Sequence, residues 1–197
     1  MNPINQRGAR GSVLIVSLIV LVVLLITIVA VIRSSDTAIG GTGNLSFKSA
    51  AVQAAERGIA LAVRQFDPGA AGPLSASAST ELDLLPANYR ASLTTTDRRG
   101  IPNVLLNATA FDAAFPNAAN RLTLATGETV RFMIDRMCRA PGAADESNCI
   151  TETNSERGGS IPRRKTGGEL VPIHRITVRV DGPKNTLHFT QVVFRGI

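Results

Sequence analysis

The stretch RGARGSVLIVSLIVLVVLLITIVAVI, residues 7–32, decides how the rest of the chain can fold. Within residues 13–32 only Ser17 and Thr27 are polar. A helix of this length spans about 30 Å, the thickness of the hydrocarbon core of a bilayer. A helix on a soluble domain is apolar on one side only. A helix that is apolar on all sides therefore predicts a membrane span or a packed bundle of such helices.

The residues on either side of this run indicate how it is used. A secretory signal has an apolar stretch of roughly 7–15 residues and then a small-residue cleavage site. The run here is longer, and Arg33-Ser34-Ser35-Asp36 follows it, so we expect the run to be retained. Arg7 and Arg10 precede it, which favours a cytoplasmic N-terminus and a translocated remainder. The sequence thus predicts a single-pass membrane protein with a cytoplasmic N-terminus and its C-terminal domain on the other side of the membrane.

The start of the apolar run, Gly11-Ser12-Val13-Leu14-Ile15-Val16, resembles the class III signal of type IV pilins and type II secretion pseudopilins. In that family a prepilin peptidase cuts after the glycine, and the new N-terminal residue is usually methylated. The resemblance implies a cut between Gly11 and Ser12. It places Leu14 and Ile15 at the third and fourth mature positions, as part of the recognition context.

A second glycine, Gly8, also precedes the apolar run. A cut after Gly8 would leave Arg10 at the start of the membrane helix, where a charge is costly. We therefore expect residues 1–11 to be the cleaved leader.

One position departs from the pattern of major pilins. They carry glutamate at the fifth mature position, which is thought to neutralise the amine of a neighbouring subunit; here that position is Val16. PilX-type minor pilins and K-type pseudopilins share this departure, and K-type proteins are usually much longer. At 197 residues the chain resembles the PilX group, and the missing glutamate implies a first subunit rather than a repeating one.

The region after the span continues the helical pattern. Residues 34–43 hold Gly40, Gly41 and Gly43, each costing a helix about 1 kcal/mol relative to alanine. They are either a linker or a loosened part of one long helix, and we favour the helix. Residues 45–66 then show an apolar stripe with helical spacing, made of Leu45, Val52, Ala55, Ile59, Val63 and Phe66. Glu56 lies off the stripe, as a solvated charge or a subunit contact.

The remaining residues, 67–197, predict a sheet domain with mobile loops. Residues 67–88 are rich in Gly, Pro, Ala and Ser and indicate a surface loop. Strand patterns follow at 89–96, 104–106, 121–125, 128–137, 174–180 and 187–194. Ile176, Val178 and Val180 share one predicted face, while Arg175, Thr177 and Arg179 share a face that we expect to be solvated.

Two cysteines, Cys138 and Cys149, follow the first predicted hairpin. An even pair in an exported chain indicates one disulfide, which would contribute roughly 2–3 kcal/mol for a loop of this size. The polar stretch 151–169 has few apolar residues and is predicted to be mobile.

No motif of catalysis or cofactor binding is present. We find no nucleophile elbow, P-loop or dinucleotide fingerprint. If the last two strands pair around Pro183, His174 and His188 fall on opposite faces and hold no metal. Glu81 and Asp83 could be imagined as a catalytic carboxylate pair, but nothing in the sequence shields them from solvent. We predict no enzyme activity, no cofactor, and no catalytic or metal-binding residue.

The charge pattern gives little support to nucleic-acid binding. The net charge is +6, and aromatic residues, which would stack on bases, make up 4% of the chain. The one basic cluster, Arg163-Arg164-Lys165, lies in a glycine-rich stretch. A solvated loop is the favoured interpretation, and an adhesive or DNA-binding module at a pilus tip is the alternative.

The pilin resemblance implies an α+β fold in which a long N-terminal helix packs on a four- to five-stranded antiparallel sheet. We expect a leader at 1–11, a membrane and assembly helix at 12–33, and its amphipathic continuation at 34–66. The implied function is that of a minor pilin that initiates or caps a type IV pilus, with a type II secretion pseudopilin as the alternative. The implied partners are other minor pilins, the major pilin, the prepilin peptidase, the inner-membrane assembly platform and a large tip adhesin. The resemblance also implies a location in the bacterial inner membrane, with the C-terminal domain in the periplasm, before assembly and in the pilus, at its tip, afterwards.

Overall fold

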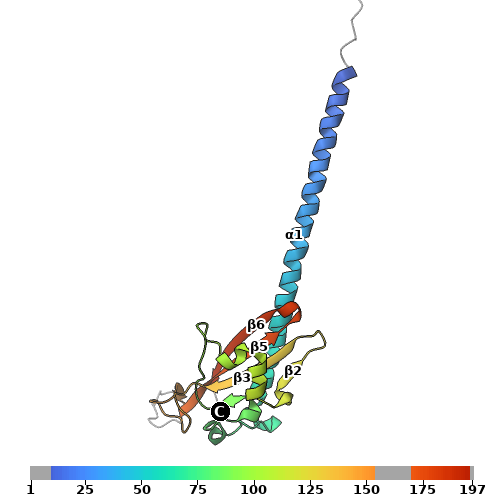
Figure 1. Cartoon of the computed structure of the whole chain (residues 1–197). Helices are drawn as coiled ribbons and strands as arrows, with labels where there is room; N and C mark the ends of the chain where they lie inside the picture. The colour runs from blue at the N-terminus through green and yellow to red at the C-terminus, as the bar shows by residue number, and fades with distance from the viewer. Residues whose placement is uncertain (1–9, 154–169, 196–197) are drawn as a thin grey trace, which may run out of the picture. The chain divides into compact units, whose positions relative to one another are not determined.

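The computed structural model describes residues 10–153 and 170–195, and this part of the chain has an α+β fold (Figure 1). The chain divides into two compact units, Met1–Lys48 and Ser49–Ile197. The long helix α1 (Arg10–Arg64) is helical throughout residues 34–43. The helix interpretation of these residues therefore holds, and the linker interpretation is wrong.

The second unit contains a sheet of six strands. Its centre is formed by three long antiparallel strands in the order β3 (Thr129–Arg136), β5 (Leu170–Asp181) and β6 (Leu187–Arg195). The predicted hairpin around residues 126–127 is present, since β2 (Arg121–Thr123) pairs antiparallel with β3. β4 (Thr151–Thr153) pairs antiparallel with the start of β5.

The expectation of a purely antiparallel sheet with four or five strands is wrong. The sixth strand, β1, is only Tyr89–Arg90 rather than residues 89–96, and it runs parallel to β3. Its partner lies 45 residues later, with Tyr89 opposite Ile134. A connection of this length allows the chain to cross over and return in the same direction, which a tight hairpin cannot do.

One face of the sheet packs on residues 49–64 of α1 through small side chains. The buried residues of this segment are Ala54, Ala55, Gly58 and Ala62. A Cβ on Gly58 would lie 2.6 Å from a methyl of Val130 and 2.8 Å from one of Val178. The predicted stripe is therefore only partly correct, because Leu45, Val52 and Val63 are exposed.

The opposite face of the sheet is also covered, which corrects the expectation of a solvated side. The short helices α2 (Asn103–Leu106) and α3 (Ala108–Ala114) lie in front of the sheet in Figure 1, with α1 behind it. Thr177 is fully buried, and Arg175 and Arg179 are almost so. A second apolar cluster fills this layer, made of Ile101, Leu105, Phe111, Phe115 and Met133.

Two other predicted segments differ in the structure. Residues 104–106 were expected to be a short strand but belong to helix α2. The loop at 67–88 is not merely superficial, since its Leu74 and Ala87 belong to the core against α1. The remaining elements are short 3₁₀ helices, at Pro68–Ala70, Ser77–Thr80, Leu85–Ala87, Ala118–Asn120 and Pro183–Asn185.

Candidate functional site

The most distinctive feature of the described chain is the apolar part of α1. The segment Val13–Ser35 is long and apolar enough to cross a membrane, with a mean hydropathy of 3.5. Its side chains are exposed on every side of the helix. Within residues 13–32 the two hydroxyl groups donate to carbonyls of the same helix, from Ser17 to Leu14 at 2.9 Å and from Thr27 to Leu24 at 2.8 Å. Such internal hydrogen bonds lower the cost of placing a hydroxyl in lipid.

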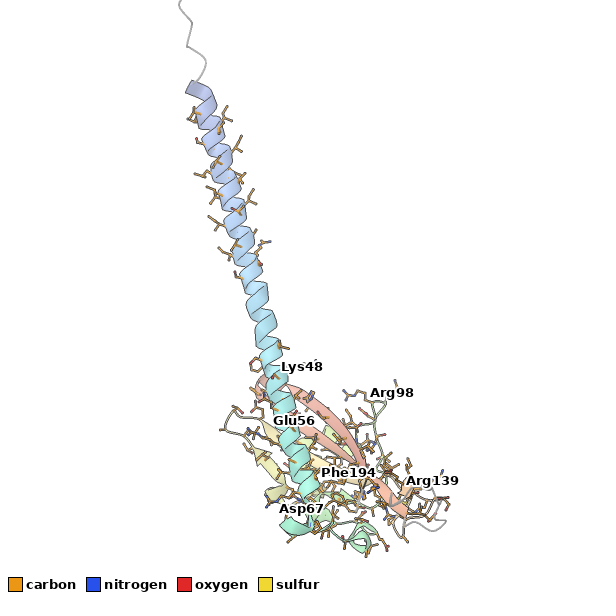
Figure 2. The ribbon with its side chains drawn as sticks, turned by 180° about the vertical axis from the view of Figure 1, so that it is seen from behind. Lys48, Glu56, Asp67, Arg98, Arg139 and Phe194 are labelled. Carbon is orange, nitrogen blue, oxygen red and sulfur yellow. A yellow bond between two sulfur atoms is a disulfide. The ribbon has the colours of Figure 1, made fainter. Side chains whose placement is uncertain are left out.

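The residues of the predicted cleavage site lie at the start of this helix. α1 begins at Arg10, so Gly11 and Ser12 lie in its first turn. The side chains of Leu14 and Ile15 are exposed, as is that of Val16. Glu56, expected to be a solvated charge or a subunit contact, is exposed on α1, where Figure 2 labels it.

The covered face of the sheet carries ion pairs that the sequence analysis missed. Arg131 donates two hydrogen bonds to the carboxylate of Asp112 in α3, of 3.0 and 3.1 Å, and a third to Asp181 at 2.7 Å. The hydrogen bond from Arg131 holds the pKa of Asp112 below its ordinary value. Arg179 also binds Asp181, and its Nη1 donates to the Leu105 carbonyl at 2.7 Å. These contacts attach α2 and α3 to the sheet.

A separate pair lies deeper on the same face. The carboxylate of Asp135 is buried and accepts two hydrogen bonds from the Arg175 guanidinium. The Thr94 hydroxyl donates to the same carboxylate at 3.0 Å. One signal in the sequence could have revealed the layer of α2 and α3 that covers this face. Three large apolar residues, Leu105, Phe111 and Phe115, follow one another at spacings of six and four residues and indicate a second apolar surface to be buried.

A polar cluster is buried on the α1 side of the sheet. The His174 ring packs against both Phe66 and Phe194, at centroid distances of 5.0 and 5.6 Å. Burial, together with the nearby positive charge of Arg136, lowers the pKa of His174 to about 4. The Tyr89 hydroxyl and Arg136 both donate to the Thr80 carbonyl, at 2.7 and 2.8 Å.

The two cysteines form a disulfide next to this cluster. Cys138 and Cys149 are both buried and bonded to each other. Nη2 of Arg136 lies 3.5 Å from the Cys149 sulfur. The disulfide therefore ties the loop after β3 to the core.

The prediction that the two histidines fall on opposite faces is wrong. His174 pairs with Phe194 and His188 with Val180, so both rings lie on the same face of the sheet. His188 of β6 lies opposite a residue six positions along β5 from His174, about 20 Å away at the usual rise per residue. Among the described residues, no group of three His, Cys, Asp or Glu side chains could hold a metal ion.

The two acidic residues considered as a carboxylate pair do not act together. Asp83 forms an ion pair with Arg90 at 2.6 Å and accepts the Ala91 N–H at 2.8 Å. Asp83 and Arg90 also line a shallow pocket of about 290 Å³ with Ser92, Thr94, Thr95, Val104, Phe115 and Met133. This lining has hydroxyl groups but no histidine, cysteine or lysine to activate one. The basic cluster at residues 163–165 lies outside the described residues.

Comparisons of the chain with protein-family models, with curated proteins and with solved structures find no match.

Proposed function

We propose that this protein is a minor pilin that initiates or caps a type IV pilus together with other minor pilins. The observation that carries the proposal is helix α1. One uninterrupted helix, Arg10–Arg64, contains both a segment apolar on all sides and a segment packed on an α+β domain. A protein that needs only a membrane anchor has no need to continue the same helix into its folded domain.

The physical basis of assembly is the exchange of one apolar environment for another. Before assembly, Val13–Ser35 contacts lipid with all its faces. Within a pilus the same faces contact helices of neighbouring subunits. Helices gain little from the hydrophobic effect when they leave lipid, so packing and the entropy of lipid must drive the step. The inner-membrane assembly platform is the proposed partner for extraction from the bilayer.

The absence of a carboxylate at Val16 supports a position at the end of the filament. The side chains from Val13 to Ile32 include no charged group. A free amine buried in an apolar bundle needs a counter-charge, and Val16 offers none to a neighbour. A subunit that starts the filament has no preceding subunit whose amine needs neutralising.

The first test is processing by the prepilin peptidase. The full chain is expressed with and without an active peptidase, and its intact mass is measured. Cleavage should remove residues 1–11 and leave Ser12 as the N-terminus. Gly11→Val should abolish this cleavage, whereas the matched control Gly8→Val should be processed normally. Retention of Met1 in peptidase-competent cells would contradict the proposal.

The second test separates a pilus from a secretion system. Deleting the gene should reduce the number of surface pili seen by electron microscopy. Expression of the full-length chain in cells with an active peptidase should restore that number. Pili in normal number together with loss of protein secretion would instead assign the chain to the pseudopilins.

A further inference from the structure

The outer edge of β6 is open. β6 pairs with β5 over its whole length, from Leu187 to Arg195, and no other described strand pairs with it. In an antiparallel pair every second residue turns its N–H and C=O away from its partner. In the turn that connects β5 and β6, the Gly182 N–H donates to the Thr186 carbonyl at 2.8 Å, so these two residues form a hydrogen-bonded pair. From this pair onward, every second residue of β6 bonds to β5 and the residues between them do not. The outward backbone groups are accordingly those of Leu187, Phe189, Gln191, Val193 and Arg195.

This edge lacks the features by which proteins usually prevent strand pairing. Charged residues, prolines, bulges and short strands serve that purpose elsewhere. β6 has nine residues and no proline, and Arg195 at its end is the only Lys, Arg, Asp or Glu in it. β5 and β6 pair residue by residue without a break, from Asp181 opposite Leu187 to Ile173 opposite Arg195. The edge strand therefore contains no bulge. By contrast, β1 and β2, beyond β3, are two and three residues long.

Apolar side chains of β6 are accessible on both faces of the sheet. On the face shared with α2 and α3, Val193 is 56% exposed and Leu187 is 48% exposed. On the other face, Val192 and Phe194 are half-buried. Phe66 packs edge-to-face on Phe194 at 4.9 Å, and Figure 2 shows Phe194 beside α1. A seventh strand beside β6 would cover side chains of both layers.

The charges around the edge are mainly positive. Arg195 ends β6 and makes no ion pair with the described residues. The loop before α2 lies against the middle of β6, because the Gln191 amide donates to the Gly100 carbonyl at 2.8 Å. That loop carries Arg98 and Arg99, with the Arg99 guanidinium over the Phe189 ring. Asp97, which pairs with Arg99, is the one acid of this group.

We propose that β6 accepts an extended segment of a different polypeptide as a seventh strand. The segment alternates apolar with polar residues and carries acidic residues near its ends. Its backbone satisfies the outward N–H and C=O groups, its apolar side chains cover Val193 and Phe194, and its acids meet Arg98 and Arg195. The proposal does not rest on the assembly role of α1.

Two other occupants fit the edge less well. A second copy pairing through β6 would bring two edges with the same arginines together, and like charges oppose such pairing. The chain's own residues 154–169 contain a proline, four glycines and only one large apolar residue, Ile161. That sequence does not supply a strand with alternating apolar residues.

The test uses synthetic peptides and the detergent-solubilised full-length protein. The probe is a fluorescein-labelled peptide that alternates Val and Thr between two aspartates at each end. Its counterpart has lysines in place of the aspartates. We expect the aspartate peptide to bind at least about tenfold more tightly by fluorescence anisotropy. Binding should also slow amide hydrogen exchange within residues 187–195.

Variants of the edge locate the site. Val193→Pro removes an outward N–H without touching the bonds to β5, and we expect it to weaken binding of the aspartate peptide at least about tenfold. The matched control Val193→Thr keeps the N–H and should bind within about twofold of the original. Arg98→Glu combined with Arg195→Glu should reverse the preference to the lysine peptide, which tests the proposal even if the proline variant does not fold.

Several results would overturn the proposal. One is absence of binding by the aspartate peptide, or equal binding by the Val193→Pro variant when that variant is folded. Another is equal affinity for the two peptides, which would remove the argument from charge. A third is disulfide cross-linking between copies of Val193→Cys in membranes, which would make a second copy the occupant.

Discussion

At the scale of single residues, we expect His174 in the core on the α1 side of the sheet to make the stability of the fold depend on pH. His174 packs against the rings of Phe66 and Phe194 and lies opposite Arg136 in the register of β3 and β5. Arg136 is itself buried, and no described carboxylate forms an ion pair with it. A second positive charge at this place is unfavourable, so the folded protein keeps His174 neutral.

The neutral state of His174 predicts a loss of stability in mild acid. Its pKa is 6.5 in the unfolded chain and about 4 when folded. The unfolded state therefore binds the extra proton first, and the free energy of unfolding falls by about 3 kcal/mol as the pH drops from 6.5 to 4. Urea denaturation followed by the fluorescence of Tyr89, the only tyrosine in a chain without tryptophan, measures this change. His174→Phe should flatten the profile, and an unchanged profile in that variant would contradict the assignment.

The buried pair of Asp135 and Arg175 should matter far more to stability than an exposed pair. Arg175→Ala leaves the Asp135 carboxylate buried without its partner, at a cost of about 3–5 kcal/mol. The matched change Arg99→Ala removes an ion pair whose arginine side chain is 68% exposed, and should cost less than about 1 kcal/mol. Urea midpoints at neutral pH compare the two. Similar losses in both variants would show that solvent reaches Asp135.

At the scale of elements, the distance between α1 and the sheet depends on small side chains. Ala54, Ala55 and Ala62 are buried between helix and strands, and Gly58 has no room for a methyl group. Of the larger apolar residues of this segment, Ile59 and Leu61 are partly buried against the same core, whereas Val52 and Val63 are exposed. The close approach brings the core strands β3 and β5 directly against the helix backbone.

Gly58→Ala tests this close contact, because two effects oppose each other. Alanine favours a helix by about 1 kcal/mol over glycine, but its Cβ would meet Val130 and Val178 at less than 3 Å. Valine is stiff about χ1, and overpacking costs about 1–3 kcal/mol. We therefore expect a net loss of about 1 kcal/mol and a greater loss for Gly58→Leu, measured by urea denaturation. Ala60→Leu, at an exposed position of the same helix, is the control and should be nearly neutral.

At the scale of the whole molecule, the unit Ser49–Ile197 contains its own core. The core includes the end of α1, and its other members come from the sheet and the loop before β1. The apolar segment Val13–Ser35 contributes no buried residue. We therefore expect folding of this unit and the proposed retention in a membrane to depend on different parts of one helix.

This division predicts the behaviour of two truncations. A chain that begins at Ser49 should leave the membrane fraction and keep a cooperative unfolding transition. A chain that begins at Asp67 lacks Ala54, Ala55, Ala62 and Phe66 and should not fold, because one face of the sheet is left bare. Cell fractionation and circular dichroism measure both outcomes. Membrane retention of the first chain, or folding of the second, would contradict the division.

The sequence by itself determined the features that depend on neighbouring residues. The apolar run at residues 13–32, the helical spacing of 45–66 and the hairpins around residues 126–127 and 181–186 are all local patterns. Only the tertiary structure decided which residues these elements bury. Small residues of α1 face the sheet because strand methyls fill the remaining space, and the arginines of β5 are buried because residues 101–115 fold over them. β1 joins the sheet in parallel through a partner 45 residues away, and no local pattern specifies a contact over that distance.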